Sequence, residues 1–197
     1  MTAALPSGTI VDPRVARTRQ AVIDAAVDLL IDGGPAAVTI DAIVTRSRVA
    51  KSTIYRHWDT RDDVLIDVLH ACGPTLPEPA EDLPVADALR ELLYGVVAMT
   101  NDPQTSRVIR TMVLLRFELD GVQDLEQRLE KEQADTIDLI LQRGVAQGAI
   151  APGYDVREVT AHLIGPLFFA HLSGALPADQ ALADQSVEFV IGAYGTT

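Results

Sequence analysis

The sequence has little cysteine, no long apolar run and no basic N-terminal segment. It contains one cysteine, Cys72, among 197 residues. A single cysteine cannot form an intramolecular disulfide, which excludes a disulfide scaffold and favours a reducing compartment, the cytoplasm. Residues 1–12 carry no basic side chain and no apolar core, so we expect no secretory signal. The longest charge-poor stretch, residues 161–178, is broken by two His, two Pro and two Gly and does not fit a membrane span.

Motifs of catalysis and of metal or cofactor binding are also missing. The sequence has no Gly-rich phosphate loop and no nucleophile-elbow motif. His162 and His171 are nine residues apart. This spacing places them about 180° apart around a helix, so they cannot chelate one ion together. We therefore predict that the chain is not an enzyme and uses no metal and no cofactor.

The net charge of −12 is distributed unevenly along the chain. Residues 1–72 hold 8 basic and 9 acidic side chains, whereas residues 73–197 hold 8 basic and 19 acidic ones. Between residues 42 and 58 there are four basic side chains and no acidic one. A cationic window in an acidic protein indicates a small electrostatic contact area for a polyanion, with the rest of the surface repelling it.

Helical periodicity runs through the chain, and no segment has the pattern of a credible strand. It covers residues 13–32, 39–46, 50–58 and 60–71, and then residues 84–100, 103–119, 122–148, 155–175 and 178–194. Four prolines between Gly73 and Pro84 mark a connection between these two groups. The pattern predicts an all-α protein of about nine helices, with one domain over residues 1–72 and a larger one over residues 73–197.

Two short helices joined by a tight turn, the second of them basic, are typical of a helix-turn-helix. Thr39 is placed to cap the first short helix, and Thr60 with Asp63 forms a capping-box pattern before the helix that follows. Three segments resemble the N-terminal domain of TetR/AcrR-family repressors: residues 21–30 (AVIDAAVDLL), 38–43 (VTIDAI) and 49–58 (VAKSTIYRHW). Gly33, Gly34 and Arg61 belong to the same resemblance. The resemblance covers about residues 14–70, and residues 165–169 resemble the regulatory domain of one subgroup.

Side chains around the second short helix are predicted to contact double-stranded operator DNA. The first turn of this helix is the end that enters a major groove and reaches base edges. Hydroxyl, imidazole and guanidinium groups near helix starts can donate to phosphates. The resemblance assigns DNA contact to seven positions, and charge and location add Arg48 and Arg56. The predicted DNA-binding residues are Thr39, Arg48, Lys51, Ser52, Thr53, Tyr55, Arg56, His57 and Arg61.

Two positions depart from the family pattern, and one aromatic residue is assigned to packing. Arg48 stands where the family usually has Gly, and a non-Gly residue in the left-handed region is uncommon. Ala50 stands where Ser is usual, so a capping hydroxyl worth about 1 kcal/mol is lost. We expect a strained turn in which Arg48 contacts a phosphate. Trp58 matches an aromatic core position, and we expect it to be buried.

The predicted helix over residues 155–175 is apolar nearly all round. Val159, Leu163 and Leu167 fall on one arc, and a helix that is apolar on its other side as well must be buried twice. The resemblance implies that this helix and the last one form a four-helix interface in a homodimer, whereas a monomeric core helix is the alternative. The residues predicted for the dimer interface are Ile164, Phe168, Leu172, Val190 and Tyr194.

One residue of the second half interrupts its apolar pattern. Arg116 projects into the middle of the apolar arc of the predicted helix 103–119, and a buried Arg must be paired. Arg116 either forms an internal salt bridge with a carboxylate such as Glu91 or Glu130, or supplies the polar group of a small-molecule pocket. The residues predicted to bind the ligand are Met112, Arg116, His162 and Phe169. Further pocket walls predicted from helical spacing are Leu93, Val97, Met99, Ile137 and Ile140.

The sequence thus predicts a ligand-responsive, DNA-binding transcriptional regulator. We favour a repressor that an unidentified small molecule releases from its operator. An activator or a ligand-independent regulator of the same architecture is the first alternative. A helical interaction module without DNA binding is the second.

Overall fold

The computed structural model describes residues 13–73, 76 and 82–196, and these residues form nine α-helices, one short 3-10 helix and a single β-bridge. They divide into two units, with the boundary between Ala71 and Cys72. The all-α prediction is confirmed. Among the described residues, no helix combines the length and the apolar character that crossing a membrane requires.

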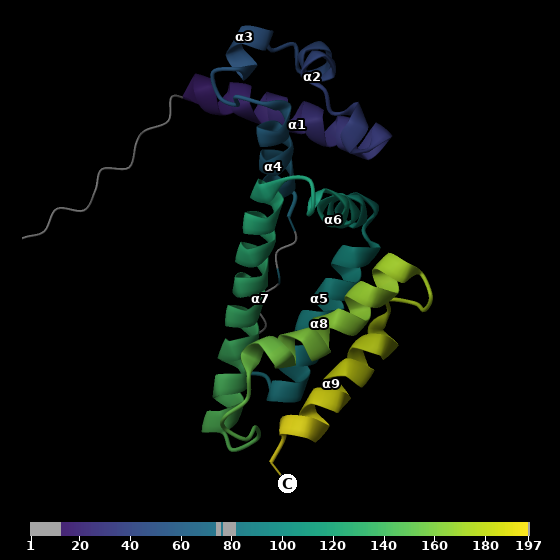
Figure 1. Ribbon diagram of the computed structural model, residues 1–197. Coiled ribbons are helices and arrows are strands. Elements are labelled where there is room, and N and C mark those ends of the chain that lie inside the picture. The colour runs from purple at the N-terminus through teal and green to yellow at the C-terminus, as the bar shows by residue number, and fades with distance from the viewer. Residues whose placement is uncertain (1–12, 74–75, 77–81, 197) are drawn as a thin grey trace, which may run out of the picture. The chain divides into compact units, whose positions relative to one another are not determined.

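The N-terminal unit contains α1 (Pro13–Gly33), η1 (Pro35–Ala37), α2 (Ile40–Ser47), α3 (Lys51–Ile54) and α4 (Arg61–Ala71) (Figure 1). Helix α1 packs against α2 and α4 and places Val22, Ala26 and Leu30 in the core. It ends at Gly33, and the φ of 72° at the next residue, Gly34, lies in the left-handed region that favours glycine. Pro35 then starts η1, so the chain turns sharply toward α2.

Helix α3 is shorter than the predicted helix 50–58. The backbone amides of Ile54 and Tyr55 bond to carbonyls four residues back, whereas those of Arg56 and His57 bond to carbonyls three residues back. The helix therefore tightens into turns after its first α-helical turn. The capping box before α4 is confirmed, since the Thr60 amide donates to Asp63 Oδ2 at 2.8 Å and the Asp63 amide donates to Thr60 Oγ1 at 3.2 Å.

The C-terminal unit contains α5 (Val85–Asn101), α6 (Pro103–Leu115), α7 (Asp120–Ala146), α8 (Val156–Ser173) and α9 (Gln180–Tyr194). Helix α5 packs against the other four and is the centre of this unit (Figure 1). Helix α6 ends four residues before the predicted end at residue 119. After Leu115 the chain forms a turn in which the amides of Glu118 and Leu119 both donate to Leu115 O, and Phe117 in this turn is 83% exposed.

His171 joins the last turn of α8 to α6. Its ring is buried, and its Nε2 atom lies 3.4 Å from Ser106 Oγ. Burial lowers the pKa of His171 below its ordinary value, and the nearby charge of Arg110 lowers it further. The unfolded chain therefore binds a proton here at a pH where the folded protein does not.

We expect this histidine to make stability depend on pH. The contribution of His171 to the free energy of unfolding is fully present above its unfolded pKa, near 6.5, and is lost as pH falls through its folded pKa. In His171→Gln this loss should be absent, because glutamine does not titrate. Melting curves from pH 7.5 to 5 would show the loss in the parent as a lower Tm. A change of 1 kcal/mol shifts the Tm of a chain this long by roughly 2–4 °C. Parallel pH profiles for the two proteins would contradict the assignment.

Candidate functional site

The turn between α2 and α3 has the strained geometry predicted for it. Arg48 lies at φ 58° and ψ 19°, in the left-handed region, and its amide donates to Val44 O at 3.0 Å. This conformation costs a non-Gly residue about 1–3 kcal/mol. The Arg48 side chain is exposed.

The N-termini of α2 and α3 are capped differently. The Thr39 side chain accepts a hydrogen bond from the Ala42 amide at 3.2 Å, which confirms it as the N-cap of α2. Ala50 gives α3 no side-chain cap, as expected. The amides at the start of α3 therefore lack a hydroxyl partner, and such amides favour an anion.

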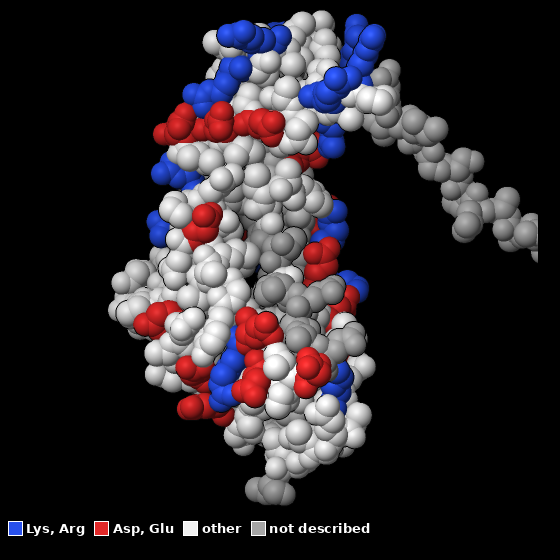
Figure 2. All heavy atoms as spheres, turned by 180° about the vertical axis from the view of Figure 1, so that it is seen from behind, with Lys and Arg blue, Asp and Glu red and all other residues white. Residues whose placement is uncertain are grey.

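Helix α3 is anchored by two apolar residues and presents polar ones to solvent. Ile54 is completely buried and Trp58 is 3% exposed, which confirms the packing role of Trp58. The side chains of Lys51, Ser52, Tyr55, Arg56 and His57 are exposed, and that of Thr53 is half-buried. Figure 2 shows the Lys and Arg side chains of this unit in separate groups, with a row of acidic side chains next to one of them.

The Trp58 ring is held by two residues that the sequence analysis did not single out. Its Nε1 donates to Asp67 Oδ2 at 2.7 Å, and Arg19 binds the same carboxylate oxygen at 2.5 Å. The Arg19 guanidinium lies 5.8 Å from the centre of the Trp58 ring. These contacts connect the end of the helix-turn-helix to α1 and α4. Arg19 lies 48 residues before Asp67, so no motif spacing signals their contact.

Lys51, the predicted base contact, already has a partner. Its Nζ donates to Asp41 Oδ1 at 2.8 Å, and this hydrogen bond raises the pKa of Lys51. Both side chains are more than half exposed, so the pair is weak. Lys51 can therefore exchange Asp41 for a base edge at little cost.

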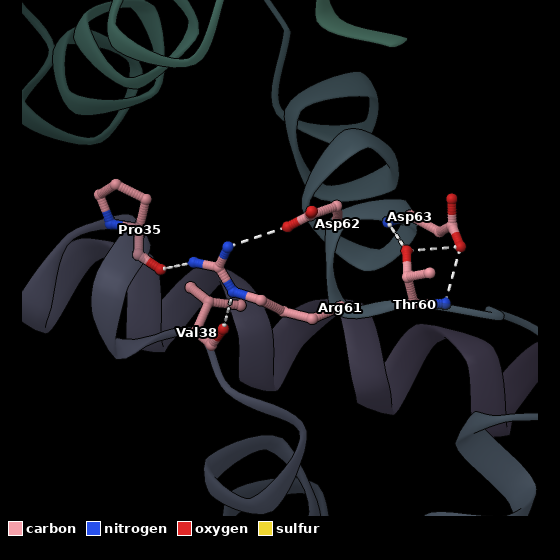
Figure 3. Close-up of polar contacts among 6 residues, drawn as sticks. All are labelled: Pro35, Val38, Thr60, Arg61, Asp62 and Asp63. Carbon is pink, nitrogen blue, oxygen red and sulfur yellow. Dashed lines mark hydrogen bonds and ion pairs between the residues drawn. The ribbon is translucent and has the colours of Figure 1, made fainter. Parts of the chain in front are cut away.

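Arg61 lies at the start of α4, where the resemblance predicts a phosphate contact. Figure 3 shows its guanidinium turned back toward the connection between α1 and α2. Its Nε donates to Val38 O at 2.7 Å, its Nη2 donates to Pro35 O, and its Nη1 lies 2.9 Å from Asp62 Oδ1. A phosphate would have to compete with all three partners. The geometry instead makes Arg61 a clamp that holds η1 and the entry to α2 against α4.

A cavity of about 960 Å³ opens between α6, α7 and α8 of the C-terminal unit. Met112 and Arg116 line it, as predicted. His162 and Phe169, the other two residues predicted for the ligand, are not among its described lining residues. Phe169 follows Phe168 directly and lies about 100° further round α8. Phe168 lines the cavity, whereas Phe169 is 61% exposed.

The environment of Arg116 also differs from the prediction. Helix α6 ends at Leu115, and the Arg116 side chain is half-exposed instead of lying within an apolar arc. Its Nε lies 3.3 Å from Glu126 Oε2, so its partner is neither Glu91 nor Glu130. Glu126 is the more buried member of this pair, with a side chain only 15% exposed.

The apolar surface of α8 divides into three strips. Val159, Leu163, Leu167 and Ala170 are buried in the core, as expected for one side of the helix. Thr160, Ile164 and Phe168 line the cavity. His162, Phe169 and Leu172 are exposed, and the His162 ring lies 5.1 Å from that of Phe189 on α9.

Val190 is completely buried in the core of the chain. Its assignment to the dimer interface is therefore wrong. Tyr194 is half-buried against the same core. Helical spacing alone could not tell which side of α9 faces α5 and α8. Phe189, on another side of α9, is 58% exposed.

The family can now be read from comparison with known proteins. Residues 22–68 match the family described as bacterial regulatory proteins, tetR family, and residues 82–190 match the tetracyclin repressor-like C-terminal domain. The chain belongs to the TetR family. It is therefore a helix-turn-helix transcriptional regulator, as the sequence predicted.

Individual relatives agree with this assignment. An HTH-type transcriptional repressor of Mycobacterium tuberculosis is 34% identical over 178 residues, which cover 84% of this chain and 80% of that protein. An HTH-type transcriptional regulator of Bacillus subtilis is 31% identical over 167 residues, covering 80% of this chain and 79% of the relative. The crystal structure of a TetR regulator from Agrobacterium tumefaciens shares the fold, with a TM-score of 0.73 at 19% identity, covering 91% of this chain and 95% of that one.

Arg61 provides a direct test of the site of this TetR-family regulator. The substitution Arg61→Met removes all three contacts of this side chain and should lower the free energy of unfolding by about 1–3 kcal/mol. Arg61→Lys should lower it too, because one ammonium group cannot reach all three partners. The salt dependence of DNA binding should stay unchanged in both variants, because Arg61 is assigned no phosphate. Thermal unfolding and DNA titrations at several salt concentrations measure both effects.

Arg56→Lys, at an exposed position in the same segment, serves as the matched control and should leave stability unchanged. If Arg61→Lys is as stable as the parent, and Arg61→Met flattens the salt slope by about one ion, then Arg61 contacts a phosphate instead.

Proposed function

We propose that this TetR-family regulator is a repressor that binds operator DNA as a homodimer and is released by a small molecule. The observation that carries the proposal is the exposed row of Lys51, Ser52, Tyr55 and His57, held outward by the buried Ile54 and Trp58. A relative at 34% identity is named a repressor, which favours repression over activation. Binding to chromosomal DNA would place the protein in the cytoplasm. Transcription of a reporter behind its operator, with and without the protein, distinguishes repression from activation.

The proposed DNA contacts fall into two groups. Lys51, Ser52 and Thr53 form the first turn of α3 and would reach base edges in the major groove. Thr39, Arg48, Tyr55, Arg56 and His57 would bind phosphates and set the register of the protein on the duplex. Asp41 must release Lys51 when the ammonium turns to a base.

The proposed dimer interface is the outward strip of α8 and α9. Phe169, Leu172 and Phe189 are 61%, 40% and 58% exposed in the single chain. The contact between the His162 and Phe189 rings shows that the exposed sides of the two helices adjoin. Large apolar side chains gathered in this way are typical of a protein interface. A second copy of the same strip would cover them and bring together two DNA-reading units for two half-sites.

The proposed ligand site is the cavity between α6, α7 and α8. Its volume of about 960 Å³ lies in the range of ordinary small-molecule pockets, roughly 300–1,000 Å³. A ligand releases the operator only if it binds more tightly to a conformation in which the two DNA-reading units no longer fit the half-sites.

DNA binding is tested on the stretch upstream of the protein's own gene. Tyr55→Phe removes one phosphate donor and should weaken binding to operator and unrelated DNA by a similar factor, about 1 kcal/mol. Lys51→Ala should reduce discrimination at one base position by about 1–3 kcal/mol. Arg110→Ala removes one positive charge from an exposed side chain of the C-terminal unit outside the cavity lining, and it should leave binding unaltered. Unchanged affinity in both Tyr55→Phe and Lys51→Ala would show that α3 does not face DNA.

The interface is tested by placing a charge on it. Phe189→Glu would bury an unpaired carboxylate between subunits, at a cost of several kcal/mol, and should yield a folded monomer with weaker operator binding. Leu139→Glu makes a similar change at a position on α7 that is 65% exposed and outside the strip, and it should remain dimeric. Sedimentation measures both, and a dimeric Phe189→Glu would move the interface elsewhere.

A further inference from the structure

The cavity between α6, α7 and α8 has apolar walls and a small set of charged groups. Its apolar surface comes from all three helices and includes Ile109, Met112, Leu129, Val156, Ile164 and Phe168. The charged residues among its described lining are three cations and three anions. Arg116, Glu130, Lys131, Asp135 and Arg157 are exposed, whereas Glu126 alone is not. The least solvated charged group facing a bound molecule is therefore a carboxylate.

Glu126 is buried further than its partner. The carboxylate side chain is 15% exposed, against 50% for the Arg116 side chain that pairs with it at 3.3 Å. Burial raises the pKa of Glu126, the charge of Arg116 opposes this, and the charge of Glu130 raises the pKa again. A single cation at 3.3 Å thus only partly offsets the burial of this acid.

The other cations of the wall are less able to anchor a guest. Lys131 is held by Asp135 at 2.5 Å, one turn along α7, and both side chains are more than 60% exposed. Arg157 is exposed in the first turn of α8. An anionic ligand would rely on such solvated groups and would bring its charge toward Glu126 and Glu130. A cationic ligand would meet the buried carboxylate and could displace the half-exposed Arg116 from it.

We propose that this cavity selects a lipophilic cation, an amine carried on an apolar body, whose ammonium group binds Glu126. The apolar body lies against the side chains of α6 and α8, and Arg116 turns to solvent when the amine takes its place. This inference rests on the proposed function, since it names the chemical class of the molecule that releases the operator.

The test compares three probes that share a twelve-carbon chain and differ in charge: dodecylamine, dodecanol and dodecanoate. Each is titrated calorimetrically into the protein, dodecylamine and dodecanoate below their micelle concentrations and dodecanol below its solubility limit. Dodecylammonium should bind at least tenfold more tightly than dodecanol, and dodecanoate more weakly than either. In Glu126→Gln the affinity for dodecylammonium should fall at least tenfold, while the affinity for dodecanol changes less than twofold.

Two further variants make the comparison specific. Arg116→Gln removes the competing cation and should raise the affinity for dodecylammonium. Glu132→Gln makes the same charge change on an exposed part of α7 outside the cavity lining, and it should bind all three probes like the parent. Operator binding by Glu126→Gln in the absence of probe shows that this variant is folded.

The results that overturn this inference differ from those that overturn the proposed function. If dodecanoate binds most tightly and releases the operator, or if Glu126→Gln binds dodecylammonium like the parent, then the ligand class is wrong and the repressor assignment stands. If no probe binds, the ligand class is wrong as well. If dodecylammonium binds through Glu126 without changing operator affinity, then the proposed role of the cavity in releasing DNA is wrong.

Discussion

The surface of α8 constrains the whole C-terminal unit, because a helix that is apolar on nearly every side must be covered on every side. Its strip of Val159, Leu163 and Leu167 is covered by the core. A second strip lines the cavity, and a third, with Phe169 and Leu172, is left exposed in the single chain. Phe168 and Phe169 are consecutive, so the helix places the proposed ligand contact and the proposed subunit contact side by side. A ligand that displaces Phe168 would therefore act directly on the interface.

The N-terminal unit depends on contacts that hold a very short recognition helix in place. Helix α3 has only four residues in α-helical conformation, too few to be stable alone. Burial of Ile54 and Trp58 anchors it, and the bonds of Trp58 and Arg19 to Asp67 join it to α1 and α4. Arg61 fixes the entry to α2 in the same way. The exposed donors of α3 are thus presented by a rigid support, which is what recognition of base edges requires.

Local features of the sequence predicted local structure well. The Thr39 cap, the Thr60–Asp63 capping box, the left-handed Arg48 and the buried Trp58 each depend on a few neighbouring residues, and each is confirmed. The partners of Arg61 lie 23 and 26 residues away, at Val38 and Pro35, so no short motif could indicate them. Helical spacing predicted the core strip of α8 correctly, but it gives only the angle between two residues and not the neighbour that each of them meets, so it could not indicate that Ile164 and Phe168 line the cavity.

The most direct test of the account is the linkage between the two sites. Whichever of the three twelve-carbon probes binds the cavity most tightly should be titrated into the free protein and into the protein saturated with operator. If the cavity controls DNA release, operator must weaken probe binding by the same factor by which the probe weakens operator binding, since coupling between two binding sites is reciprocal. We expect this factor to lie in the range of about 5–150 that is typical of allosteric proteins. Equal affinity of the probe for the free and the operator-bound protein would contradict the account.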